Sequence, residues 1–191
     1  MKAVFCMFFS EQTLHMAVFD ALCACLDLDC HSREAASLIR EAYAEPENAP
    51  RPARNRNAVY WTILRDPAAD PVCDAYIPES AGAGRNTHVV YTTLKYQLVI
   101  VCYGPACEEY ANRIRTMLYT DGFRRPRRIL RSAGIYPVPD PPRPALLHEE
   151  EGSLWRKRAD LSVSLRVRDE QRSGPVGSVR TVPAVILHKH P

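Results

Sequence analysis

One long apolar segment that ends abruptly constrains the fold of this 191-residue chain more than any other feature. Residues Thr87 to Tyr103 are rich in β-branched and aromatic side chains, which predicts a strand. At about 3.3 Å per residue a straight strand of this length would reach roughly 55 Å, longer than strands usually are. We therefore expect it to bend or to extend beyond the core as an arm. Two shorter strands broken near Lys95 are the alternative.

A Gly-Pro pair ends this strand and starts a helix. Gly104 permits backbone angles that are closed to other residues, and Pro105 suits a first helical turn because its missing N–H would have no partner there. From Pro105 to Tyr119 the apolar side chains form one stripe and the charged ones another. The sequence thus predicts an amphipathic helix directly after the longest strand.

The remaining segments complete an α+β pattern. Ser10 to Leu28 has the spacing of a helix, Glu34 to Tyr43 suits either a helix or an extended segment, and Asp66 to Gly84 reads as a long loop. Strands are predicted for Ala58 to Leu64, Leu154 to Val167 and, after a turn through Ser173, Gly174 and Pro175, about Val179 to Leu187. We expect an antiparallel sheet of about four or five strands against two helices, with a long strand arm and proline-rich loops.

Composition favours one soluble domain in a reducing compartment. The chain is 46% hydrophobic and 25% charged, as globular proteins are, and its 16 prolines indicate several extended segments. We divide it into an N-terminal arm, residues 1–9, and a single α+β domain, residues 10–191. The apolar run in the arm is too short to span a membrane. Seven cysteines without a secretory leader predict reduced thiols in a cytosol.

A cysteine-rich stretch suggests one chemical alternative. Cys23, Cys25, Cys30 and His31 are soft ligands within nine residues, and four such ligands suit zinc. On a helix, however, Cys23 and Cys25 would point to nearly opposite faces, and free cysteine is a common core residue. A zinc-dependent protein is kept as a rival, and we expect no metal.

The charged residues gather in two blocks of opposite sign. Five arginines lie close together, namely Arg124, Arg125, Arg127, Arg128 and Arg131. They suit DNA phosphate or an acidic subunit, although the ordinary interpretation is a solvated loop near the end of a helix. The acidic run Glu149 to Glu151 reads as a solvated turn.

Catalytic patterns are missing from the sequence. The six histidines are scattered, without a metalloprotease motif or a nucleophile elbow. Gly82 to Arg85 lacks the Gly-Lys-Ser/Thr ending of a phosphate loop. We therefore expect no enzyme, no catalytic residue and no cofactor.

Several segments taken together resemble the neck or tail terminator proteins of long-tailed phages. The resemblance covers about residues 49–168 and follows the family's order of strand, Tyr-Gly-Pro, helix, proline-rich link and late tryptophan. The segments that carry it are Tyr96 to Pro105, Ala111 to Arg115, Leu130 to Ser132, Tyr136 to Pro144 and Trp155 to Leu161.

This resemblance implies a virion structural protein assembled in the host cytoplasm. It implies a homo-oligomeric, hexameric ring that caps the tail tube and joins it to head-completion proteins, with DNA passing transiently through the channel. Its partners would be further copies of itself, the tail tube protein and the head-completion proteins, and no membrane. The alternatives are a head-completion or connector protein of the neck, and a nonspecific DNA-binding accessory protein.

A ring interface also predicts which residues meet the next copy. A closed ring joins one patch to a different patch, and exposed strand edges pair readily with a neighbour. The subunit-interface candidates are Arg124, Arg125, Arg127, Arg128, Arg131, Tyr136, Pro139 and Trp155. The arginines are expected to face acidic residues of the neighbouring copy.

Overall fold

The computed structural model describes residues 10–42, 55–66, 72–78, 85–120, 122, 124–151 and 154–177. These residues form four helices: α1 (Glu11–Cys25), α2 (Arg33–Leu38), α3 (Cys107–Tyr119) and α4 (Arg124–Ser132). They also form seven strands: β1 (Ile39–Glu41), β2 (Ala58–Asp66), β3 (Val72–Pro78), β4 (Arg85–Tyr103), β5 (Ile135–Pro137), β6 (Ala145–Glu151) and β7 (Leu154–Gly177). No described helix is long and apolar enough to cross a membrane.

All seven strands belong to one mixed sheet. Its order is β1-β2-β4-β7-β5, with β3 also paired to β4 and β6 also paired to β7. Every pairing is antiparallel except that of β1 with β2. The predicted α+β class is therefore found. The expected numbers, about four or five antiparallel strands and two helices, were both too low, because the described residues form seven strands and four helices.

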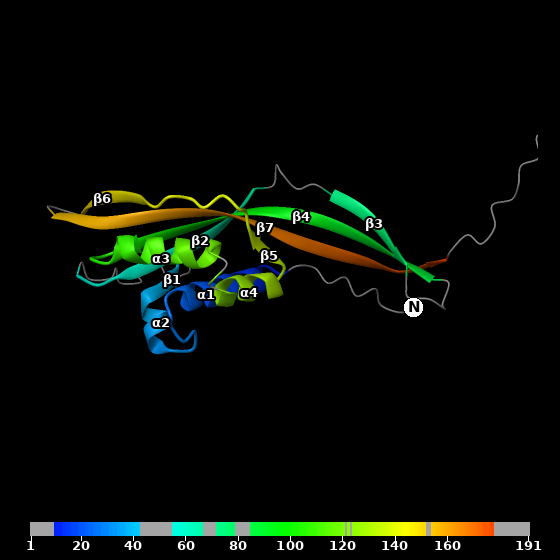
Figure 1. The fold of residues 1–191 in the computed structure, drawn as a ribbon, viewed down its shortest axis with the longest axis horizontal. Coiled ribbons are helices and arrows are strands. Elements are labelled where there is room, and N and C mark those ends of the chain that lie inside the picture. The colour runs from blue at the N-terminus through cyan, green and yellow to red at the C-terminus, as the bar shows by residue number, and fades with distance from the viewer. Residues whose placement is uncertain are drawn as a thin grey trace, which may run out of the picture.

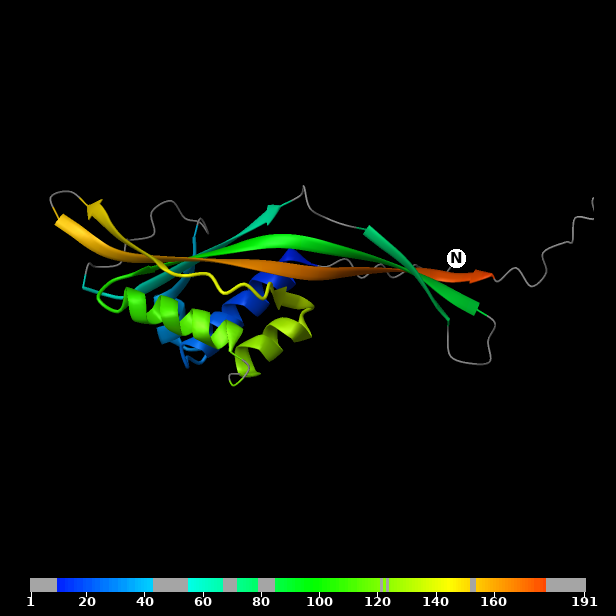
Figure 2. The ribbon, with the colours of Figure 1, turned by 45° about the horizontal axis from the view of Figure 1, so that its top comes forward.

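The helices cover one face of this sheet (Figure 2). Along β7 the residues alternate, so that Leu161, Val163 and Leu165 are buried under the helices while Ser162 and Ser164 lie exposed on the opposite face. Apolar residues of β2, β4, α1 and α3 fill the same layer. The core is thus a two-layer body, because only one face of the sheet carries a continuous set of apolar side chains.

Two strands continue out of this body as an arm (Figure 1). β4 has 19 residues and β7 has 24, and they stay paired from Tyr103 and Arg158 to Arg85 and Gly177. β2 ends opposite Lys95, and β3 then takes its place beside the outer part of β4. The prediction that the long strand extends beyond the core is confirmed.

Two predictions for this region were wrong. The stretch Asp66 to Gly84, expected to be a loop, contains β3, because the length of β4 leaves an edge for another strand to pair with. The turn expected through Ser173, Gly174 and Pro175 lies inside β7. The strand predicted for Val179 to Leu187 lies outside the described residues, as does the N-terminal arm of residues 1–9.

The break after β4 has the positive φ predicted for its glycine, but the helix begins at Cys107 with Ala106 as N-cap, so Pro105 precedes it rather than lying in its first turn. Gly104 has φ of +101°, and its N–H donates to the Lys157 carbonyl at 3.3 Å. A Cβ at this position would lie 2.6 Å from the Arg56 carbonyl oxygen and 2.7 Å from Asn57 Oδ1. Asn57 in turn accepts a hydrogen bond from the Ala106 N–H at 2.9 Å. Glycine is therefore required here for both conformation and space.

Candidate interaction surfaces

The arginine cluster lies on helix α4 rather than on a loop, which corrects the sequence interpretation. Pro126 and Leu130 are buried, and together they hold one side of the helix against the body. Proline is tolerated in a first helical turn, so Pro126 does not prevent the helix. Four arginines on the other side are exposed, namely Arg124, Arg125, Arg128 and Arg131, and we call this set the arginine face. Arg127 is half-buried and makes other contacts.

The arginine face is electrostatically unfavourable by itself. α4 has no acidic residue in its first turn, where the helix dipole favours negative charge. Arg124 lies one turn from Arg128, and Arg128 is three residues from both Arg125 and Arg131, so like charges are neighbours along the surface. Such a helix gains from an external anion.

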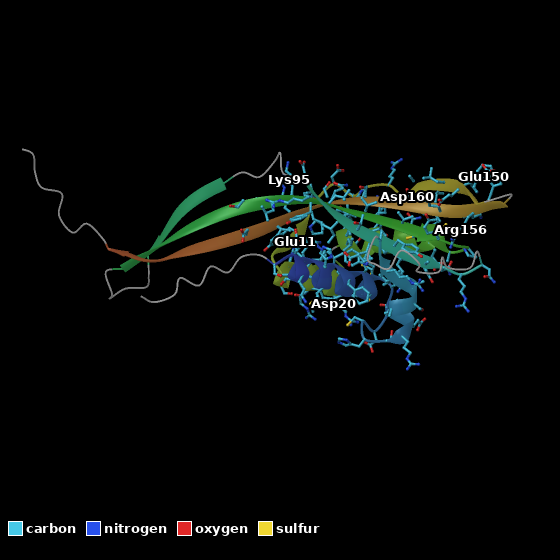
Figure 3. The ribbon with its side chains drawn as sticks, turned by 180° about the vertical axis from the view of Figure 1, so that it is seen from behind. Glu11, Asp20, Lys95, Glu150, Arg156 and Asp160 are labelled. Atoms are coloured by element: carbon cyan, nitrogen blue, oxygen red, sulfur yellow. The ribbon has the colours of Figure 1, made fainter. Side chains whose placement is uncertain are left out.

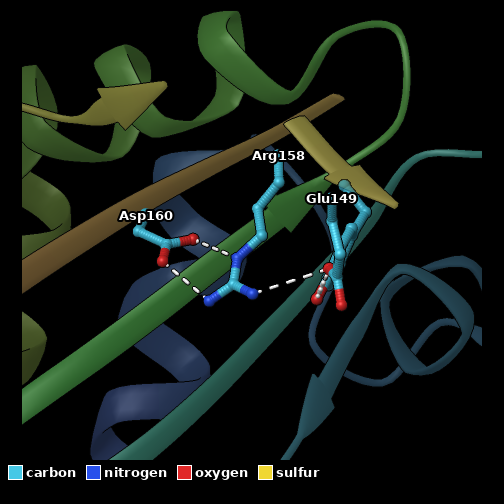
Figure 4. Close-up of polar contacts among 4 residues, drawn as sticks. Glu149, Arg158 and Asp160 are labelled. Carbon is cyan, nitrogen blue, oxygen red and sulfur yellow. Dashed lines mark hydrogen bonds and ion pairs between the residues drawn. The ribbon is translucent and has the colours of Figure 1, made fainter. Parts of the chain in front are cut away.

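A second cluster, which sequence reasoning missed, joins three strands at the other end of the body. Tyr103 donates a hydrogen bond to Glu149 at 2.8 Å, and the guanidinium of Arg156 lies 4.5 Å from the Tyr103 ring centre. Arg158 makes two hydrogen bonds to Asp160, at 2.6 and 2.7 Å, and an ion pair with Glu149 at 3.5 Å (Figure 4). The cluster ties β6 to both β7 and β4.

The ionisation of this cluster follows from its contacts. Burial, together with the hydrogen bond to Glu149, raises the pKa of Tyr103 to about 12. Hydrogen bonding to Asp160 raises the pKa of Arg158. Arg156 is only 7% exposed and stacks on the aromatic ring. The phenol stays neutral and Arg158 stays charged, so the cluster acts as a structural joint.

This joint also corrects the interpretation of the acidic run. Glu149, Glu150 and Glu151 were expected in a solvated turn, but all three belong to β6 and pair with Arg156, Trp155 and Leu154. Glu149 is neutralised within the chain by Arg158. This charge run therefore forms a strand, with one of its three carboxylates compensated by an arginine of the neighbouring strand.

The remaining predicted interface residues lie along one long edge of the sheet. Tyr136 is in β5, Pro139 is exposed in the link after it, and Trp155 begins β7 beside the turn from β6. Trp155 is 67% exposed, and Leu146, on the same face of the β6–β7 pair, is 53% exposed. We call β5, the link and β6 the outer edge. The structure brings these residues to one edge, and it places the arginine face separately in the helix layer.

The cysteine-rich stretch forms part of the core. Cys23 and Cys25 are buried in α1, and burial raises the pKa of Cys23 to about 11 and that of Cys25 to about 12. Zinc is bound by the thiolate, which such burial disfavours. Over the residues described, no three His, Cys, Asp or Glu side chains are grouped to hold a metal ion.

A comparison with sequence models of protein families assigns the chain to a family. A sequence model described as phage neck terminator protein matches residues 16–189, which is most of the chain. A search of curated proteins finds no match. The family extends further toward both termini than the segments from which the resemblance was first drawn. The chain therefore belongs to the phage neck terminator protein family, and its role is that of a structural protein of the virion neck.

Proposed function

We propose that this protein forms a homo-oligomeric, hexameric ring that caps the tail tube and joins it to the head-completion proteins. The observation that carries the proposal is the outer edge, where exposed Trp155 and Leu146 adjoin a strand whose far side pairs with no other described strand. A strand edge of this kind is a ready template for a neighbouring chain. Large exposed apolar side chains beside it favour association.

A closed ring differs from a symmetric pair in the surfaces that it uses. In a ring each copy presents one surface to the preceding copy and a different one to the next. On this proposal the outer edge, including Tyr136 and Pro139, is one of the two surfaces. The arm formed by β3, β4 and β7 then projects from every copy toward the tail tube or the head-completion proteins. No catalytic or cofactor chemistry is part of the function.

The first test is the mass of the purified protein in solution, measured by light scattering over a range of concentrations. Negative-stain imaging would follow for any large species. Rings of about six copies are expected. Binding to purified tails that lack the protein should be measured in parallel, so that a ring closing only on the tube is also detected. A protein that stays monomeric and does not join such tails would contradict the proposal.

Paired variants test the outer edge itself. Trp155→Ser with Leu146→Ser should weaken ring formation, because it removes the exposed apolar contacts without touching the core. Met16→Ser is the matched control, since Met16 is 60% exposed on α1, away from the outer edge. Rings that survive in the double variant as well as in the control would show that the interface lies elsewhere.

A further inference from the structure

We propose that the arginine face of α4 is a sequence-independent binding surface for the phosphate backbone of duplex DNA. The proposal rests on the proposed function for its setting, the passage of DNA through the ring, and on the structure for its chemistry. It replaces the expectation that these arginines meet acidic residues of the next copy.

The first step is the arrangement of the charges. Arg124 and Arg131 are seven residues apart, which at 1.5 Å per residue is about 10 Å along the helix. Duplex DNA carries one negative charge per about 1.7 Å, so about six phosphate charges occupy the same length. Four exposed guanidinium groups on one helical face can therefore contact several phosphates at once. Guanidinium also matches phosphate in hydrogen-bond geometry.

The second step is that the described part of the chain leaves these charges without an ion-pair partner. Other basic side chains are paired internally, as Arg113 is with Asp27 and Arg158 is with Asp160. Within the ranges that the structure describes, none of the four residues of the arginine face has an ion pair. Their mutual repulsion remains until an anion is bound.

The third step separates DNA from an acidic protein surface. Exposed Glu150 lies at the end of the body away from the arm (Figure 3), and exposed Glu108 and Glu109 are in the first turn of α3, which follows the break at Gly104. The exposed basic residues Lys157 and Arg56 both adjoin Gly104 through their backbone carbonyls. With this end a second copy thus offers a mixed surface to four like charges, whereas a phosphate backbone is uniformly negative. Because no aromatic side chain accompanies the arginines on α4, stacking on bases is not expected.

The test measures binding to a short, fluorescein-labelled duplex of mixed sequence by fluorescence anisotropy at several salt concentrations. With four phosphate contacts, the logarithm of the binding constant should fall with the logarithm of the salt concentration at a slope of about −3.6. Arg125→Gln with Arg128→Gln should halve this slope to about −1.8 and weaken binding at low salt. Glutamine is a good helix former, and circular dichroism would verify that the fold is retained.

Arg33→Gln with Arg56→Gln is the matched control. It removes two exposed positive charges from other parts of the surface and should keep the wild-type slope. The inference is overturned if the control loses as much affinity as the α4 variant, or if the wild-type protein does not bind the duplex at low salt.

Ring formation, measured on the same variants, separates the two proposals. An α4 variant that binds DNA normally but no longer forms rings would place the next copy on the arginine face. That result would overturn the inference and leave the proposed function standing. If the protein bound DNA through α4 yet formed no ring in solution or on tails, the inference would hold and the ring would be wrong.

Discussion

Replacing Gly104 by alanine should cost about 2–6 kcal/mol of unfolding free energy, through two separate effects. The first effect is conformational. At φ of +101° an L side chain is strained, and such strain costs of order 1–3 kcal/mol. Since domains are stable by only about 5–15 kcal/mol, a loss of the predicted size would be seen readily in denaturant unfolding.

The second effect is steric. The new Cβ would lie 2.6 Å from the Arg56 carbonyl oxygen, 2.7 Å from Asn57 Oδ1 and 2.9 Å from Asn57 Cα. Two of these atoms belong to the backbone, so the segment before β2 must move. Overpacking of this kind typically costs about 1–3 kcal/mol. The movement also weakens the hydrogen bond from the Ala106 N–H to Asn57, which contributes about 1 kcal/mol.

Two other glycines provide controls that separate the effects. Gly134→Ala keeps a positive φ, +72°, but its Cβ would lie 3.5 Å from the Arg168 carbonyl oxygen, an ordinary contact, so strain alone of about 1–2 kcal/mol is expected. The Cβ of Gly122→Ala meets no described residue within 4 Å, and the change should alter stability by less than about 0.5 kcal/mol. Equal losses for Gly104→Ala and Gly134→Ala would refute the close-approach argument.

Three further predictions concern the body of the protein. Burial raises the pKa of Cys23 to about 11 and those of Cys25 and Cys102 to about 12, against an ordinary value of 9.0. Above pH 9 the folded state therefore holds more protons than the unfolded chain, so the free energy of unfolding should fall by about 4 kcal/mol per pH unit near pH 10. A free energy of unfolding in urea that stays unchanged between pH 9 and pH 11 would contradict this prediction. Arg113→Met removes the hydrogen bond from Arg113 Nε to the Cys25 carbonyl at 2.8 Å and should cost about 1–2 kcal/mol of unfolding free energy. Asp27→Asn breaks only an exposed ion pair with Arg113 and should cost less than about 0.5 kcal/mol. Equal shifts in the unfolding midpoint would be evidence against this ranking. Chelators should leave the thermal midpoint unchanged, because Cys23 and Cys25 are protonated core residues, and a lowered midpoint would reveal a structural metal.

The sequence predicted those elements whose pattern is local. β4, α3 and the first part of β7 have apolar positions at the spacing of a strand or a helix, and Gly104 has a conformation that few other residues adopt. These features depend on neighbouring residues in the chain. For that reason they could be recognised without knowledge of the partners.

The features that were missed depend on residues far apart in sequence. α4 is stabilised by packing of Pro126 and Leu130 on the body, and its five arginines concealed that apolar side. β6 is held through Glu149 by Tyr103 and Arg158, which come from two other strands. The family resemblance indicated a neck protein. No local pattern in the sequence, however, predicts that the outer edge and the arginine face are two separate surfaces.

The pairing of β4 with β7 also determines when the chain can fold during synthesis. β7 lies between β4 and the outer edge, and it supplies Leu161, Val163 and Leu165 to the core. Until it leaves the ribosome, β4 has an open edge and the helices have only part of a sheet to cover. Contacts between such distant segments make folding slow and leave intermediates prone to aggregation. The body therefore completes its core only after β7 has been synthesised, and a chain stopped before Leu154 would lack its central strand pair.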